Sequence, residues 1–122
     1  MILDTSALLS FFEFSVDWER ELARLVDSYT IVIPVAVIQE LTLLSTRGTG
    51  DTQRYAKAAL IYALRYDTVE TQATGADEAV VEAAKKMKGI VFTNDTELRH
   101  HLREEDIPVL LLRGRKKLAL EG

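Results

Sequence analysis

The segment IVFTNDTELR, residues 90–99, decides the expected fold of this chain. It starts with three apolar residues, passes through Thr93, Asn94 and Asp95, and continues as a short helical pattern. A continuous apolar run of this length is typical of a strand that is buried on both faces of a parallel sheet. The acid that follows lies at the carboxyl edge of the sheet, where α/β proteins bind their ligands. The segment therefore predicts an α/β protein with a polar site at that edge.

Similar apolar runs lie on both sides of this segment. They are Met1–Leu3, Ile31–Ile33 and Val109–Leu112, with a weaker, alternating fifth strand at Thr68–Thr71 that suits a sheet edge. The helices expected between them span Thr5–Phe14, Trp18–Ser28, Val35–Leu44, a stretch capped by Asp51, Asp77–Met87 and Thr96–Glu104. Strands that alternate with helices form parallel βαβ units. We therefore expect a three-layer α/β/α sandwich around a mostly parallel sheet of about five strands, followed from about residue 113 by a short basic C-terminal segment.

Length and composition narrow the possible functions. The 122 residues suit one domain over 1–122, and the net charge of −4 argues against binding nucleic acid by overall charge alone. Nine of the 15 basic residues nevertheless lie between residues 85 and 117, which leaves a local basic rim open. Cysteine is absent and the only histidines are His100 and His101, so thiolate and multi-histidine metal sites are excluded. With no apolar run long enough for a membrane span and no signal peptide, we expect a cytoplasmic protein.

Four acidic residues stand out by their positions. Asp4 directly follows the first strand, Glu40 lies in the helix after the second, Asp77 heads a helix, and Asp95 follows the strand at residues 90–92. Each shares a helix face with apolar residues, where an acid is not expected unless it is paired or binds a metal ion. Asp4, Asp77 and Asp95 could each also be helix caps, an interpretation that Glu40 in a helix interior does not allow.

Carboxylates gathered at one edge would repel each other, and a divalent cation relieves that repulsion. Hard oxygen ligands without histidine or cysteine favour Mg²⁺ or Mn²⁺. Such an ion can polarise a phosphoryl oxygen and activate water. The four acids therefore indicate metal-assisted hydrolysis of a phosphodiester.

The ordered set of polar motifs resembles the PIN-domain family of ribonucleases. The matching residues are Asp4-Thr5-Ser6, Glu40, Asp77 and Thr93-Asn94-Asp95, with separations of 36, 37 and 18 residues between the four acids. The similarity covers nearly the whole chain. The run at residues 93–99, followed by Ile107-Pro108-Val109, is most similar to archaeal members, which include VapC-like toxins and proteins similar to ribosomal-RNA-processing nucleases.

The resemblance implies a divalent-metal-dependent endoribonuclease that cuts single-stranded RNA, as a VapC-like toxin or as an RNA-processing nuclease. It also implies a homodimer and, for a toxin, an antitoxin protein as partner. By position, the catalytic and metal-binding residues would be Asp4, Glu40, Asp77 and Asp95, with Mg²⁺ or Mn²⁺ as the cofactor. The hydroxyls of Ser6 and Thr93 would orient a carboxylate or a water, with Asn94 as a further supporting residue. Glu78 would replace Asp77 if the alignment slips by one residue, and Glu97 would be an auxiliary acid.

RNA would approach these acids along a basic rim whose side chains contact phosphates without reading sequence. The candidates are Arg47, Arg54, Arg99, Arg113 and Arg115, together with Lys116 and Lys117. Trp18 and the phenylalanines at positions 11, 12 and 14 fit the core or a dimer contact better than they fit base stacking.

Two other classes of function are open. The first is a PIN-like module that binds RNA or a protein without cutting. The second is a phosphoryl-transfer protein on a similar sheet. Arg113 stands where a receiver domain has lysine, and Ser6 stands where a haloacid-dehalogenase-like phosphatase has a second aspartate, so the sequence disfavours both forms of this second class.

Overall fold

A computed structural model describes all residues from Met1 to Gly122. Its elements are β1 (Ile2–Leu3), α1 (Thr5–Glu13), α2 (Trp18–Leu25), β2 (Val32–Pro34), α3 (Val35–Arg47), α4 (Gly50–Ala63), β3 (Asp67–Val69), α5 (Ala76–Met87), β4 (Val91–Phe92), α6 (Thr96–Glu104), β5 (Val109–Arg113) and β6 (Lys117–Glu121). The strands form one sheet in the order β3-β2-β1-β4-β5-β6. The expected α/β fold is confirmed.

The five strands that the sequence predicts all run parallel. β1 lies between β2 and β4, and its Ile2 is aligned with Val32 on one side and Val91 on the other. These central strands are buried on both faces, which is why their sequences are apolar without alternation. β3 lies at the edge, as expected, although it starts at Asp67 and ends at Val69 rather than spanning Thr68–Thr71.

The C-terminal segment corrects the expectation of about five strands. Instead of a basic tail, residues after Gly114 turn back and form β6, which pairs antiparallel with β5 from Lys117 to Glu121. Gly114 and Arg115 both have positive φ, which allows the tight turn. Only Leu118 of β6 is fully buried, so this strand carries too little apolar sequence to be recognised as one.

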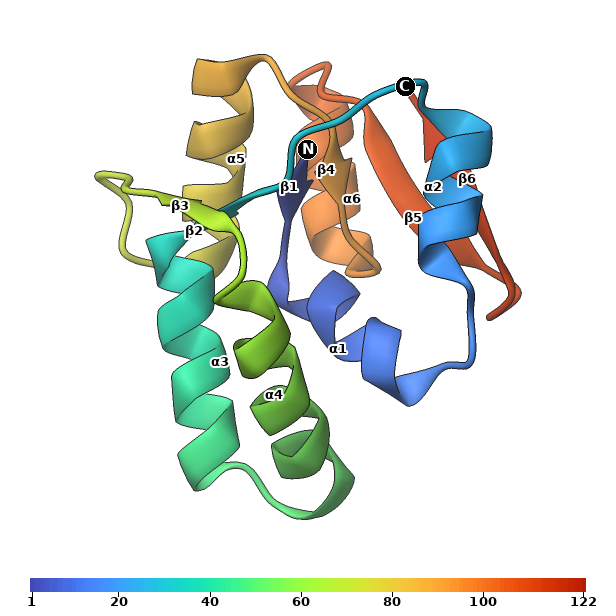
Figure 1. Cartoon of the computed structure of the whole chain (residues 1–122). Helices are drawn as coiled ribbons and strands as arrows, with labels where there is room; N and C mark the ends of the chain where they lie inside the picture. The colour runs from blue at the N-terminus through green and yellow to red at the C-terminus, as the bar shows by residue number, and fades with distance from the viewer.

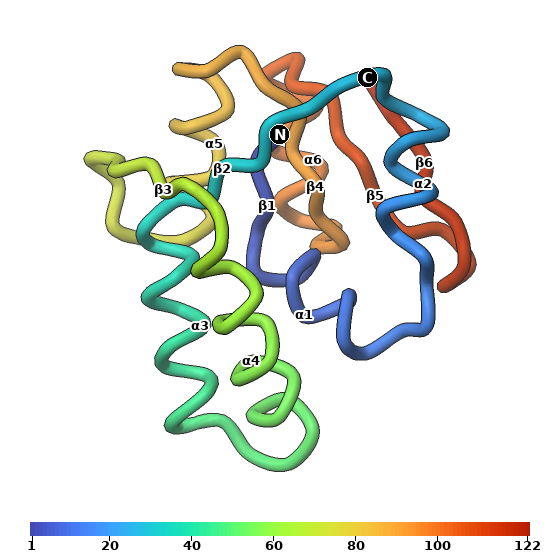
Figure 2. The backbone as a smooth tube through the Cα atoms, viewed as in Figure 1, coloured from blue at the N-terminus to red at the C-terminus, as the bar shows by residue number.

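Helices cover both faces of the sheet (Figure 1). α5 and α6 lie behind it in this view, α2 lies in front of it beside β6, and α1 and α4 are seen below the strands. α3 and α4 run antiparallel to each other and project past the carboxyl edge of the sheet, as the tube in Figure 2 also shows. The chain's two ends lie together at the opposite, amino edge. None of the helices is both long and apolar enough to cross a membrane.

Helix starts differ from the expectation at two acids. Thr49, not Asp51, is the N-cap of α4, and Gly75, not Asp77, is the N-cap of α5. Both aspartates lie in the first turns of their helices, where a negative charge is favoured by the helix dipole. A cap role therefore does not explain Asp77.

Candidate active site

Asp4 is the buried centre of the carboxyl edge, with only 4% of its surface exposed. It ends β1 and caps α1 by accepting the backbone N–H of Ala7 at 2.9 Å. Its carboxylate also accepts the hydroxyls of Ser6, at 2.9 and 3.0 Å from its two oxygens, and of Thr93, at 2.6 Å. The cap interpretation is thus correct for Asp4, but the cap uses only part of the carboxylate.

The hydroxyls of Ser6 and Thr93, which lie 3.2 Å apart, also accept hydrogen bonds from the backbone. Ser6 accepts the backbone N–H of Asn94 at 2.9 Å, and Thr93 accepts that of Asp95 at 3.0 Å. Each hydroxyl therefore has its own proton free to donate, and both can donate it to Asp4. The result is a connected network that ties β1 and α1 to the loop between β4 and α6.

The same loop is fixed at two further points. Asp95 caps α6 by accepting the backbone N–H of Leu98 at 3.2 Å, which confirms its cap interpretation. Asn94 accepts the backbone N–H of Leu112 at 2.9 Å through its side-chain oxygen and so ties the loop to β5. The supporting positions expected at Ser6, Thr93 and Asn94 are therefore all occupied by hydrogen-bonded side chains.

Burial raises the pKa of Asp4 to about 6, because desolvation of the carboxylate outweighs the hydrogen bonds from Thr93, Ala7 and Ser6 that favour its charged form. The charge of Asp77 raises it slightly further. The Asp4 carboxyl therefore ionises only as the pH rises through about 6, well above the range of an exposed aspartate. A positive charge beside it would favour the charged form and lower this pKa.

The other two acids lie on helices at the carboxyl edge, Glu40 on α3 and Asp77 on α5. Glu40 is half-buried, and Asp77 is exposed, contrary to the expectation of an apolar face, because it lies in the first turn of α5 ahead of the buried Val80 and Val81. Neither carboxylate accepts a hydrogen bond from the protein, which sets them apart from Asp4.

The electrostatics of Asp77 show which acids it faces. Desolvation raises its pKa most, followed by the charges of Asp95, Glu40, Glu78 and Glu97, in that order. The charges of two of the other acids singled out in the sequence thus act on Asp77, and the charge of Asp77 acts on Asp4. The two ambiguous acids, Glu78 and Glu97, line a small cavity of about 150 Å³ beside Asp77, between the first turns of α5 and α6.

The chemistry of these side chains fits a hard divalent cation, since every donor is a carboxylate or hydroxyl oxygen. The positions of these side chains, however, do not form a closed metal site. No three Asp, Glu or His side chains come close enough together to form a ready metal-binding group. The metal-ligand role of the four acids stays a prediction.

Several arginines of the expected basic rim form ion pairs within the protein. Arg99 and Arg113 both pair with Glu121 on β6, at 3.8 and 3.4 Å, and Arg54 pairs with Asp51 at 2.6 Å. Arg115 lies in the β5–β6 turn with its guanidinium 5.5 Å from the ring centre of Phe14. This turn follows the carboxyl end of β5, on the same edge as Asp4 and Asp95. Arg47, at the end of α3, forms no ion pair.

The aromatic residues pack against each other, as expected for a core. Phe11 stacks on Trp18 with ring centres 4.4 Å apart and meets Phe92 edge to face. Tyr62 packs its edge against Phe11, Phe12 and Trp18. These contacts join α1, α2 and α4 over the front of the sheet.

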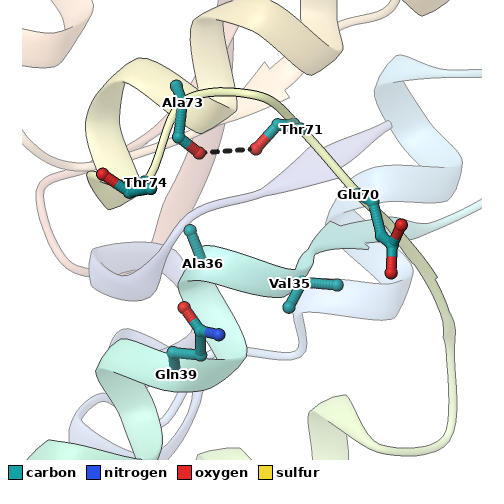
Figure 3. Close-up of a pocket in the computed structure, with 7 residues that line it drawn as sticks. All are labelled: Val35, Ala36, Gln39, Glu70, Thr71, Ala73 and Thr74. Carbon is teal, nitrogen blue, oxygen red and sulfur yellow. Dashed lines mark hydrogen bonds between the residues drawn. The ribbon is translucent and has the colours of Figure 1, made fainter.

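A cavity at this edge is not predicted by any sequence pattern. A cavity of about 220 Å³ opens between the start of α3 and the loop after β3, and Gln39, Glu70 and Thr74 are among the residues that line it (Figure 3). Its two walls are far apart in the sequence and carry no motif.

The fold and the site together define an α/β protein with an acidic carboxyl edge. The family model described as "PIN like domain" matches residues 1–115, and the chain belongs to this family. The resemblance expected from the sequence is thereby confirmed.

Two relatives extend the match over the full chain. The chain is 32% identical over 126 residues to "Ribonuclease VapC4" of Methanocaldococcus jannaschii, covering 100% of this chain and 96% of that protein. It is 30% identical over 120 residues to "Ribonuclease VapC9" of Archaeoglobus fulgidus, covering 98% and 87%. Among solved structures, that of the PIN domain endonuclease Utp24 superposes with a TM-score of 0.77 at 24% identity, over 98% of this chain and 89% of that one, which supports the fold.

Proposed function

We propose that residues 1–122 act as one PIN-like nuclease domain, a divalent-metal-dependent endoribonuclease that hydrolyses phosphodiester bonds of single-stranded RNA. Asp4, Glu40, Asp77 and Asp95 form its acidic centre, and Mg²⁺ or Mn²⁺ is its cofactor. The observation that supports this proposal is electrostatic. The pKa of Asp77 is raised first by desolvation and then by the charges of Asp95 and Glu40, which come from segments distant in the sequence. These three acids are therefore near enough to act on a common ligand. The relatives named as ribonucleases support the same activity.

The side chains of the proposed centre have different roles. Thr93 and Ser6 hold the Asp4 carboxylate in one orientation and favour its charged form by donating their hydroxyl protons. Asp95 is held by the start of α6, so it also presents a fixed oxygen. Glu40 and Asp77, which accept no hydrogen bonds, are free to rotate toward a cation. When bound, the cation would neutralise the carboxylates and polarise the scissile phosphodiester.

A second candidate function is a PIN-like module that binds RNA or a protein without cutting. One observation favours it, namely that the acidic side chains do not converge into a ready metal-binding group. Rotation of Glu40 and Asp77 would remove this objection, because both are unconstrained. The nuclease is therefore the better supported of the two.

The experiment is cleavage of labelled single-stranded RNA by the purified chain with Mg²⁺, with Mn²⁺ and with chelator. Asp4→Asn and Asp95→Asn are compared with Glu104→Gln, a matched control in an exposed glutamate at the end of α6. The proposal expects metal-dependent cleavage that is lost in both aspartate variants and kept in the control. Retention of RNA binding without cleavage under any metal would favour the binding module instead.

For partners, we propose RNA as substrate, a homodimer, and an antitoxin protein if the chain acts as a toxin rather than in RNA processing. Ile61 in α4 and Leu64, the C-cap of this helix, support a protein-contact surface, since they are 67% and 64% exposed. Light scattering of the wild type and of Ile61→Glu tests the homodimer. A wild type that stays monomeric at micromolar concentration contradicts it.

A further inference from the structure

The cavity beside the acidic edge is built from the two segments that lead to the proposed catalytic acids. Val35, Ala36 and Gln39 come from the first turns of α3, and Gln39 immediately precedes Glu40. Glu70, Thr71 and Thr74 come from the loop after β3, and Thr74 lies three residues before Asp77. Figure 3 shows these two walls facing each other, with Ala36 and Gln39 directed from α3 toward the loop. A group in this cavity would lie next to whatever the acids bind.

The cavity is small and has mixed walls. Its volume of about 220 Å³ is below that of pockets for drug-sized ligands, so it suits one ring system. Val35 and Ala36 provide apolar contact on the α3 side. No aromatic side chain lines it, so a bound ring would be recognised at its edge rather than by stacking.

Three exposed polar side chains that line the cavity form no hydrogen bond or ion pair within the protein. The Gln39 amide can both donate and accept, the Glu70 carboxylate can only accept, and the Thr74 hydroxyl can do either. Thr71, by contrast, is already used, because its hydroxyl donates to the carbonyl of Ala73 at 2.9 Å. Figure 3 shows the Glu70 carboxylate at the end of the cavity beside Val35, with Thr74 at the opposite end. A group bound beside Val35 would therefore meet Glu70 as a strong acceptor.

The loop that forms one wall is held in place from α5. The Glu82 carboxylate accepts the backbone N–H of Gln72 at 2.8 Å and that of Ala73 at 3.0 Å. Two charge-assisted hydrogen bonds at adjacent residues fix the loop where it crosses above α3. The wall is therefore a preformed part of the fold and not a free loop.

We propose that this cavity is a base-recognition pocket for the RNA nucleotide next to the cleaved phosphodiester, and that it favours a base with an amino group over uracil. This inference rests on the proposed nuclease function. The Glu70 carboxylate would accept the amino hydrogens of cytosine, adenine or guanine. Guanine would bind best, because its adjacent ring N–H and amino group can both donate to one carboxylate. Uracil has no amino group and would leave the carboxylate poorly matched.

The test maps cleavage positions on a single-stranded RNA of random sequence by sequencing the product ends. The wild type is expected to prefer an amino-bearing base over uracil by about tenfold at one fixed position beside the cut. Glu70→Gln keeps the shape of the side chain but adds an N–H donor, so it should shift the preference toward uracil. Gln39→Ala should weaken the preference without reversing it. Gln72→Ala is the matched control, because Gln72 is on the same loop but does not line the cavity.

A second measurement separates this inference from the proposed function. Binding of short uridine oligonucleotides with one central guanine, cytosine, adenine or uracil is measured with chelator present, so that no cleavage is needed. If RNA is cut and bound with the same base pattern by wild type, Glu70→Gln and Gln39→Ala, the pocket is overturned while the nuclease stands. If no RNA is cut, the nuclease falls, and the pocket is then supported by a Glu70-dependent base preference in binding or overturned by its absence.

Discussion

The acidic edge has a held half and a free half. In the held half, Asp4 and Asp95 are fixed by hydrogen bonds from Ser6, Thr93 and two helix starts. In the free half, Glu40 and Asp77 accept no hydrogen bond, and desolvation followed by the charges of other acids raises the pKa of Asp77. The two pairs of acids therefore differ in their freedom to move. Asp4 and Asp95 would define the position of a bound cation, and the side chains of Glu40 and Asp77 could rotate toward it.

The largest effect is expected from the free half. Asp77→Asn should lower metal-dependent RNA cleavage by about a thousandfold, because it removes a proposed metal ligand. It should change the thermal stability of the metal-free protein little, since the relief of repulsion offsets the lost interaction with the helix dipole and no hydrogen bond is broken. Single-turnover cleavage and thermal unfolding with chelator measure the two effects. Unchanged cleavage in Asp77→Asn, with Glu78→Gln inactive instead, would move the ligand role by one residue.

The buried acid of the held half should make stability depend on pH. Burial raises the pKa of Asp4 from its ordinary 3.8 to about 6. Between these values the folded protein binds more protons than the unfolded chain, so the free energy of unfolding falls as the pH rises. The loss is on the order of 3 kcal/mol between pH 4 and pH 7.

Asp4→Asn removes this titration. Its free energy of unfolding, measured by denaturant titration at pH 4 to 7 with chelator, should vary less with pH than that of the wild type. The difference between the two proteins should therefore move in favour of the variant toward neutral pH. Glu104→Gln, at an exposed site, should follow the wild-type curve. Parallel curves for wild type and Asp4→Asn would show that Asp4 ionises normally.

Thr93 tests the hydrogen bonds that define the held half. Thr93→Val keeps the shape of a fully buried side chain but removes the hydroxyl that donates to Asp4 and accepts from Asp95. We expect a loss of about 1–3 kcal/mol in the free energy of unfolding and a 10- to 100-fold loss of cleavage. Thr52→Val on the exposed face of α4 is the control for both readings. If Thr93→Val kept full activity, the orientation of Asp4 would not depend on this network.

The sequence predicts the held half better than the free half, for a physical reason. Ile33, Phe92 and their neighbours form continuous apolar runs, so the strands and the polar residues that follow them could be located. Thr93 and Asp95 are supported by contacts within a few residues, which a local pattern can reveal. Asp77 was misjudged as lying on an apolar face, because the exposure of a first-turn residue depends on where the helix leaves the sheet.

Features that join distant segments could not be predicted from the sequence. β6 has only Leu118 fully buried and depends on pairing with β5, so its basic sequence resembled a tail. The cavity lined by Gln39 and Glu70 exists only because α3 lies beside the loop after β3. Arg99 was expected on the basic rim, but no local pattern shows that Glu121 pairs with it.

Arginines of the basic rim also differ in how they are held, because some form ion pairs and others do not. Their substitution is expected to have the smallest effect on RNA binding. Arg115, in the turn at the carboxyl edge, forms no ion pair, whereas the exposed Arg54 is held by Asp51. Arg115→Ala should weaken binding of single-stranded RNA about two- to fivefold at low salt and reduce the salt dependence by about one phosphate contact. Arg54→Ala should change affinity less than twofold, because its charge is already partly neutralised and exposed pairs contribute little. Fluorescence anisotropy over a salt series measures both variants. Equal losses would mean that position along the edge, rather than pairing, decides which arginines meet the RNA.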